Sequence, residues 1–230
     1  MNVFELSLRV FLIENIHLED VFTEISRFVD LGLSNDKDFL ELHNKNTFKN
    51  YCFNSFYPLE IDKVYKKNNI YTIKVRTIDS ELATFFHQHL PSIQTLSIKG
   101  LVGEVRIIPK KYIEKIYSVT PVVIKCDNGY WRKIINIHEY EKRIKDNLIK
   151  KYNTFNNTSI NEEFNLYDSI EFTNRKPIST KYKEINILGD KISLNISSDK
   201  KAQELAYMSL GVGLLEMNAR GMGYVNYKWL

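Results

Sequence analysis

His43 and Lys49 lie in one polar stretch, residues 43–50, and Tyr51 follows it directly. The pKa of histidine lies near neutrality, so an imidazole can both accept and donate a proton during a reaction. A lysine ammonium can stabilise the charge that develops on a reacting phosphate. These residues suit metal-free cleavage of RNA, in which the 2′-hydroxyl attacks the adjacent phosphate. The sequence shows no Asp, Glu and His cluster typical of a two-metal nuclease, so we expect no metal and no cofactor.

Each of these residues also has a simpler interpretation. A histidine in a loop is often only a surface residue, and a lone lysine is often a solvated charge. Tyr51 begins a β-prone stretch, so packing in a strand is the alternative to a catalytic role. Lys45, between His43 and Lys49, is a candidate RNA contact.

Glycines gather near the C-terminal end of the chain, in residues 211–223. Such a cluster indicates a backbone that turns tightly or lets a ligand approach closely. Backbone N–H groups beside a helix end can hold phosphate. The alternative is a helix C-cap followed by a turn into a strand. The candidate RNA-binding residues of this segment are Gly211, Gly213, Asn218, Arg220, Gly221 and Gly223.

Two basic stretches are further candidates for an RNA-binding surface. The first surrounds Pro177, and its candidate contacts are Arg175, Lys176 and Lys181. The second is the outer face of a helix expected over 137–152. The basic residues of that face are Lys142, Arg143, Lys145, Lys150 and Lys151. The alternative for both stretches is a solvated face; as RNA contacts they would give salt-dependent affinity.

The composition is that of a globular protein of one large or two small domains. The chain has 230 residues, 43% of them hydrophobic, and a net charge of +4, which permits a nucleic-acid partner without proving one. Cys52 and Cys126 are too far apart for metal-type spacing and fit a reducing cytoplasm. The first residues do not read as a signal peptide, and no apolar run is long enough for a membrane helix. We expect a cytoplasmic protein with no membrane partner.

The periodicity of apolar residues predicts an α+β fold. In the first half it predicts strands at 3–13, 51–57, 70–78, 93–98 and 101–108, and helices at 18–33, 36–42 and 79–90. In the second half it predicts strands at 112–117, 121–125, 166–172, 184–188, 191–196 and 224–229, and helices at 137–152 and 199–210. The strands at 184–188 and 191–196 are expected to be joined by a turn at Gly189 and Asp190.

Each half has the order β-α-β-β-α-β, which is typical of a ferredoxin-like unit. We predict two tandem ferredoxin-like domains, residues 1–117 with His43 and residues 118–230 with the glycine-rich segment. The strand at 112–117 is counted with the first domain.

Three stretches resemble the CRISPR-associated endoribonucleases that cut repeat RNA, the sixth Cas family. Leu42-His43, with Lys49, Tyr51 and the strand that follows, looks like the family's Leu-His and Lys-x-Phe-x-Phe-Ser pattern. Thr120-Pro121-Val122-Val123 is similar to the family's entry into its second unit. Residues 218–223 resemble the family's Asn-Ser-Met-Gly-Phe-Gly. The resemblance covers most of the chain, although the spacer between Gly213 and Gly221 is longer than in the family.

The resemblance implies a metal-independent endoribonuclease that leaves a 5′-hydroxyl and a 2′,3′-cyclic phosphate and retains its product. It implies His43 as general acid or base and Lys49 as phosphate stabiliser. Many members place a catalytic tyrosine before the histidine, but no tyrosine precedes Tyr51 here. Either Tyr51 substitutes for it, or His43 and Lys49 act alone. In the family, a β-hairpin at the region of Arg175 to Lys183 often inserts at the base of an RNA stem.

The partners implied are CRISPR repeat RNA and other subunits of an effector complex, and a second copy in a homodimer is a further candidate. The main alternative is a non-catalytic RNA-binding subunit of a CRISPR ribonucleoprotein. An RRM-like reader is disfavoured because the sequence lacks the aromatic motif of that class. A dinucleotide-binding enzyme is disfavoured because the Gly-x-Gly pairs follow a helix near the C-terminus, not a strand early in the chain.

Overall fold

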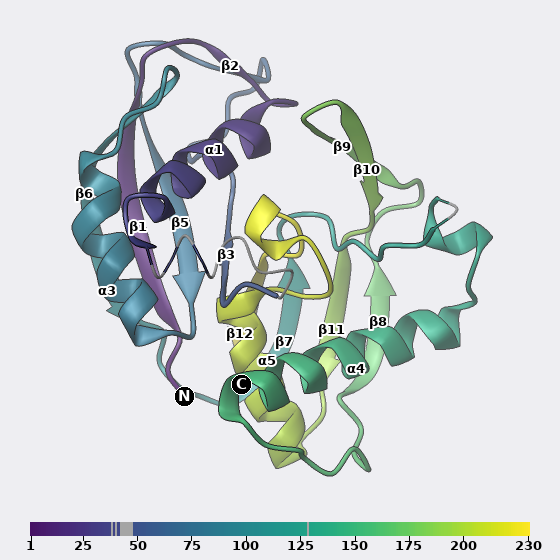
Figure 1. The fold of residues 1–230 in the computed structure, drawn as a ribbon. Helices are drawn as coiled ribbons and strands as arrows, with labels where there is room; N and C mark the ends of the chain where they lie inside the picture. Colours follow the sequence, from purple (N-terminus) through teal and green to yellow (C-terminus); the bar gives the residue numbers. More distant parts are fainter. Residues whose placement is uncertain (38, 40, 42–47, 128) are drawn as a thin grey trace.

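The computed structural model describes residues 1–37, 39, 41, 48–127 and 129–230 (Figure 1). The first sheet is built on β1, Phe4–Leu12, which pairs antiparallel with β5, Ile70–Thr77, and with β6, Ile98–Ile107. The short β3, Tyr51–Phe53, completes the order β3-β5-β1-β6. Along β1, Leu6, Leu8, Val10 and Leu12 are buried because alternate side chains of a strand face the same side.

Two helices cover one face of this sheet. They are α1, Val21–Leu33, and α3, Ser80–His89. The inward stripe of α1 includes Phe22, Ile25 and Val29, at the spacing of one helix face. Asp79 caps α3 by accepting hydrogen bonds from the backbone N–H groups of Glu81 and Leu82.

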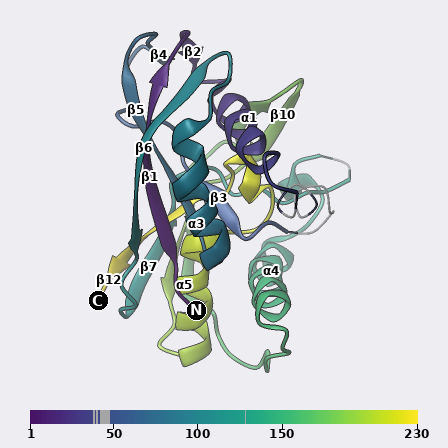
Figure 2. The same ribbon diagram turned by 60° about the vertical axis from the view of Figure 1, so that its left-hand side comes forward.

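The second sheet repeats this arrangement. Its strands are β7, Ile113–Ser118; β8, Tyr167–Phe172; β11, Ile192–Ile196; and β12, Val225–Trp229, in the order β12-β7-β11-β8. Its helices are α4, Ile137–Asn156, and α5, Lys200–Val212. Figure 2 shows α1, α3 and α4 on one side of the molecule and β1, β6, β7 and β12 on the other. None of the helices in the described ranges is both long and apolar enough to span a bilayer.

Both sheets have the same strand order, with the first and third strands of each unit in the middle. This order and the element sequence β-α-β-β-α-β confirm the predicted α+β fold of two ferredoxin-like units. The pairing of β7 with β11 and β12 places the strand at 113–118 in the second sheet. The division of the chain into domains at 117 and 118 stays a prediction.

Two strand predictions and one turn prediction were wrong. Residues 93–98 are not a strand, because Pro91 lies in the 3-10 helix η1, Leu90–Ser92, and the Thr95 hydroxyl accepts hydrogen bonds from Ser97 and Ile98. Residues 121–125 form only isolated bridges, Val122 with Asp190 and Val123 with Glu216.

The predicted turn at Gly189 and Asp190 was the third error. Instead β9, Ile178–Tyr182, and β10, Ile185–Gly189, form a hairpin, in the region where the resemblance implies one. Asp190 is buried and its carboxylate accepts hydrogen bonds from Tyr130, Trp131 and Asn174. It therefore anchors the base of the hairpin. A second small pair, β2, Ile16–His17, and β4, Val64–Tyr65, lies at the edge of the first unit.

A buried arginine joins the two sheets. Arg76 of β5 donates hydrogen bonds to Glu5 of β1 at 2.7 Å, to the Val225 carbonyl at 2.7 Å and to the Asn226 side chain at 2.9 Å. Its guanidinium lies 4.4 Å from the centre of the Tyr224 ring. The helix α5 contacts β7 and β12 of its own unit and also β3 and β5 of the first unit. The two units therefore share a tight junction.

Candidate functional site

A cavity of about 480 Å³ lies between α4, the segment after α5 and the chain that enters β3. Among the described residues that line it, the charged ones are Lys49, Lys125, Lys150, Lys151, Arg220 and Glu216. The Glu216 carboxylate accepts a hydrogen bond from the backbone N–H of Lys125 at 2.6 Å. Positive charge from separate parts of the chain therefore converges on one hollow, which is the environment that a phosphate group needs.

The segment between α5 and β12 forms one wall of this cavity. It is closed by hydrogen bonds from Leu214 N–H to the Gly223 carbonyl and from Gly223 N–H to the Pro121 carbonyl. Gly223 has a φ of 67°, and a Cβ there would lie 2.2 Å from the Leu214 oxygen. Glycine is required at this position because the backbone of the opposite arm of the loop occupies the space of a side chain.

Asn218 holds this loop together from the inside. Its Nδ2 donates hydrogen bonds to the Leu214 and Met222 carbonyls at 2.9 Å and 3.0 Å. Its Oδ1 accepts one from Lys151 Nζ at 2.7 Å. Since Asn218 is buried and these bonds all lie within the protein, the geometry favours a structural role over the predicted contact with RNA.

Arg220 lies at the end of the 3-10 helix η3, Asn218–Arg220, and faces the first unit. Its guanidinium donates a hydrogen bond to Asp30 of α1 at 2.9 Å. It also lies 5.3 Å from the centre of the Tyr182 ring in the β9–β10 hairpin. The predicted residue Arg220 thus connects the cavity to α1 and to the hairpin.

Lys49 lies in the cavity, in the chain that leads into β3. Partial burial lowers its pKa, and the neighbouring Arg220 lowers it further, while Asp30 opposes this effect. An anion that entered the cavity would be attracted by both cations. His43 and Lys45 lie outside the described residues. Of the predicted histidine-lysine pair, the structure therefore describes only Lys49.

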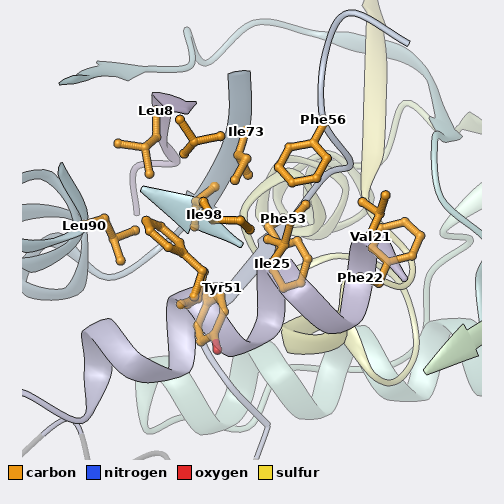
Figure 3. Packing of buried hydrophobic residues seen from close by; sticks show 14 of the residues in the cluster. Leu8, Val21, Phe22, Ile25, Tyr51, Phe53, Phe56, Ile73, Leu90 and Ile98 are labelled. Carbon is orange, nitrogen blue, oxygen red and sulfur yellow. The ribbon is translucent and has the colours of Figure 1, made fainter. Parts of the chain in front are cut away.

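Tyr51 is only 2% exposed and packs edge-on against Phe86 with a ring-centre distance of 5.3 Å. Its hydroxyl has no hydrogen-bond partner among the described residues, and burial raises the pKa of the phenol. Figure 3 shows Tyr51 among the packed side chains of the first core, with Phe22 and Phe53. This environment favours the packing alternative for Tyr51 over proton transfer.

Of the remaining predicted RNA-binding residues, the glycines have a structural role and the basic residues lie at the β9–β10 hairpin. A Cβ on Gly211 would lie 2.7 Å from the Ile78 side chain, and one on Gly221 would lie 2.2 Å from Phe22, so both glycines permit close packing between the units. Gly213, with a φ of 72°, ends α5. Arg175 and Lys176 are exposed before β9, and Lys181 in β9 forms an ion pair with Asp20 at 3.1 Å.

Several residues that line the cavity were not predicted from the sequence, among them Lys125, Asn147 and Glu216. Lys125 is a lone lysine with no local pattern around it, so only the fold could place it there. Lys151 was assigned to the outer face of α4, and this was wrong. It continues the buried row of Ile144 and Leu148 at helical spacing and is 2% exposed. No group of metal-ligand side chains gathers within the part of the chain that the structure describes.

Comparisons with known proteins show which family this chain resembles. The family model described as "CRISPR associated protein Cas6, C-terminal" matches residues 104–227. A Methanocaldococcus jannaschii protein described as "CRISPR-associated endoribonuclease Cas6 2" is 23% identical over 213 residues, which are 85% of this chain and 87% of that protein.

Two solved structures have a similar fold. One, described as an RAMP protein binding different RNA substrates, has a TM-score of 0.73 at 14% identity and covers 98% of this chain and 99% of its own. The other comes from a Cas6-related gene of Pyrococcus furiosus and has a TM-score of 0.67 at 14% identity, with 98% of each chain covered.

Proposed function

Since this chain belongs to the Cas6 family of CRISPR-associated proteins, we propose that it is a metal-independent endoribonuclease that cuts CRISPR repeat RNA at the cationic cavity. The observation that carries this proposal is the convergence of Lys49, Lys125, Lys150 and Arg220 on one hollow, and Lys49 follows His43 closely in the sequence. The named activity of the relative from Methanocaldococcus jannaschii supports the same class of reaction.

The reaction needs no group beyond the RNA and the protein side chains. The 2′-oxygen loses its proton to a base and bonds to the neighbouring phosphorus. The bond from phosphorus to the 5′-oxygen then breaks, and that oxygen receives a proton. The products are a 2′,3′-cyclic phosphate and a 5′-hydroxyl. His43 serves as general base, general acid or both, because its pKa range suits both steps.

Lys49 stabilises the charge on the phosphorane. Its position beside Arg220 gives the scissile phosphate two cations, and the phosphate in turn relieves the repulsion between them. Lys125 and Lys150, which line the same cavity, bind neighbouring phosphates of the RNA backbone.

The β9–β10 hairpin contributes the second contact area for RNA. Arg175 and Lys176 are exposed at its base, and Lys181 is held near α1 by its ion pair with Asp20. Arg220 lies against Tyr182 of the hairpin, so RNA bound there continues toward the cavity. The protein then keeps its product and passes it to other CRISPR subunits, either as a monomer or as a homodimer.

A cleavage assay with labelled repeat RNA from the source genome tests this function. It is run in excess EDTA, with a matched RNA that lacks the 2′-hydroxyl at the cut site. We expect one cut in the normal RNA, a cyclic phosphate at its 3′ end, and no cut in the deoxy RNA. Tight binding of both RNAs without any cut would instead assign the chain to non-catalytic RNA-binding subunits.

A further inference from the structure

Lys150 and Lys151 are neighbours on α4 but lie in different environments. Lys150 is exposed and lines the cavity. Lys151 borders the same cavity but is only 2% exposed, because it is covered by the loop that forms the cavity wall. A fully buried lysine is unusual in a protein unless its ammonium has partners, so its contacts require an explanation.

The Lys151 ammonium is bound by three oxygen atoms of one loop. Its Nζ donates hydrogen bonds to the Gly213 carbonyl at 3.1 Å, the Leu215 carbonyl at 2.8 Å and the Asn218 Oδ1 at 2.7 Å. An ammonium has three N–H groups, so these acceptors use its full donor capacity. The same Asn218 binds the Leu214 and Met222 carbonyls, so Lys151 reaches both arms of the loop.

These partners are neutral, and burial lowers the pKa of Lys151 to about 7. Cys52 and Glu216 favour the charged form from a distance but do not offset the burial. The lysine therefore carries a large desolvation cost with no direct ion pair among the described residues. A methionine would fill the same space without that cost, which suggests that the hydrogen bonds to the loop have a role beyond stability.

The loop held by Lys151 carries a residue of the proposed site. Asn218 begins the short helix η3, and Arg220 ends it. Arg220 is fixed at its other end by Asp30. The position of this guanidinium in the cavity thus depends on contacts at two points, one made by Lys151 and one made by α1.

We propose that Lys151 is a positioning residue, whose ammonium fixes the loop 213–223 so that Arg220 meets an RNA phosphate beside Lys49. The role in RNA cleavage rests on the proposed function of the cavity. The effect on the loop does not, and it can be measured without RNA.

The first arm of the test is amide hydrogen exchange of the free protein. The variants are Lys151→Met, which removes all three hydrogen bonds, and Lys142→Met, which changes an exposed lysine of the same helix outside the cavity. We expect exchange in 213–223 to rise about tenfold in K151M and to stay unchanged in K142M, with the rest of both proteins protected as in wild type. Unchanged exchange of the loop in K151M would overturn the proposal.

The second arm measures RNA cleavage by K151M, Arg220→Ala and the double variant. If Lys151 acts through the loop, K151M raises KM for RNA about tenfold with a smaller fall in kcat, and the double variant is no worse than R220A alone. Additive losses in the double variant would overturn a role through Arg220. If K151M fails to fold, Lys151→Gln replaces it, because the glutamine amide keeps two N–H donors. Amide exchange in 213–223 should then be faster in K151Q than in wild type. Exchange of the loop at the wild-type rate would overturn the proposal.

The two arms separate the inference from the function it rests on. A wild-type protein that does not cut RNA would remove the proposed function but leave the exchange result standing. A wild-type protein that cuts RNA, with K151M equal to it in both arms, would remove the inference and leave the function.

Discussion

Arg220 donates a hydrogen bond to Asp30 at 2.9 Å and thereby ties the loop after α5 to the helix α1 of the first unit. The two residues are far apart in the sequence, both are partly buried, and Arg220 lines the cavity that contains Lys49. The carboxylate of Asp30 acts on Lys49 as well, where it opposes the effect of Arg220 on the lysine pKa. The proposed site is therefore assembled at the junction of the two units.

Lys49 is expected to be the main cation for the phosphorane. Lys49→Ala should lower kcat about 100-fold, because one preorganised charge is lost from the transition state. Lys49→Arg should recover part of that loss. Single-turnover cleavage of repeat RNA measures both, with Lys99→Ala, an exposed lysine of β6 outside the cavity, as the control. Equal rates for K49A and K99A would show that Lys49 is not part of the reaction.

Tyr51 is expected to act through packing alone. Tyr51→Phe should leave the cleavage rate within about twofold of wild type and should not lower the melting temperature, because the hydroxyl has no hydrogen-bond partner in the described part of the chain. Tyr51→Ala should lower stability by about 3–5 kcal/mol through the cavity that it leaves. A large loss of cleavage in a well-folded Y51F protein would restore the catalytic role.

Glu5 and Arg76 are expected to contribute strongly to stability. Both are buried, and the Glu5 carboxylate also pairs with Arg106 at 2.8 Å and Lys74 at 3.3 Å. Glu5→Gln leaves Arg76 without its charge partner and should cost about 3–5 kcal/mol of unfolding free energy in urea titrations.

A matched control exists on the surface of the second sheet. Glu114 forms an exposed ion pair with Lys228, so Glu114→Gln should cost at most about 1 kcal/mol. If E5Q and E114Q lost similar amounts of unfolding free energy, the buried ion pairs of Glu5 would not be important for stability.

Lys151 should make stability depend on pH. Its pKa is about 7 in the folded protein, well below the value of about 10.4 for an unfolded lysine. Between these values the unfolded state binds more protons than the folded state, so the unfolding free energy contributed by this residue rises with pH. Below about pH 7 both states are charged and the burial cost is present in full.

Urea unfolding of wild type and K151M at about pH 6.5 and about pH 9 measures this effect. The groups that act on Lys151, Cys52 and Glu216, are unchanged in the variant. Wild type should gain stability relative to K151M as pH rises. A difference between the two proteins that does not change with pH would contradict the burial effect on Lys151.

The periodic elements of both units could be predicted from the sequence. The alternation in β1 and the helical spacing in α1 are local patterns, and repeating them in the same order gives the ferredoxin-like arrangement. The partner of β10 could not be predicted, because the sequence near Gly189 reads as a turn while the buried Asp190 in fact collects hydrogen bonds from distant residues.

The candidate site was predicted only in part. Lys49 and Arg220 were identified by residue type and local motif, and the fold brings both to one cavity. Lys125 carries no local signal, and Asn218 was assigned to RNA although its amide binds the loop that contains it. The burial of Lys151 was also not predicted, because a lysine near the end of a basic helix is usually exposed. Its burial becomes evident only when its position on the helix is compared with that of the buried Ile144 and Leu148.

The most direct test of this account compares wild type with His43→Ala in single-turnover cleavage of repeat RNA, together with a filter-binding measurement of RNA affinity. The account predicts that H43A binds the RNA within a few-fold of wild type and cuts it at least about 100-fold more slowly, because the proton transfers lose their acid or base. An H43A protein that cuts the RNA as fast as wild type would contradict it.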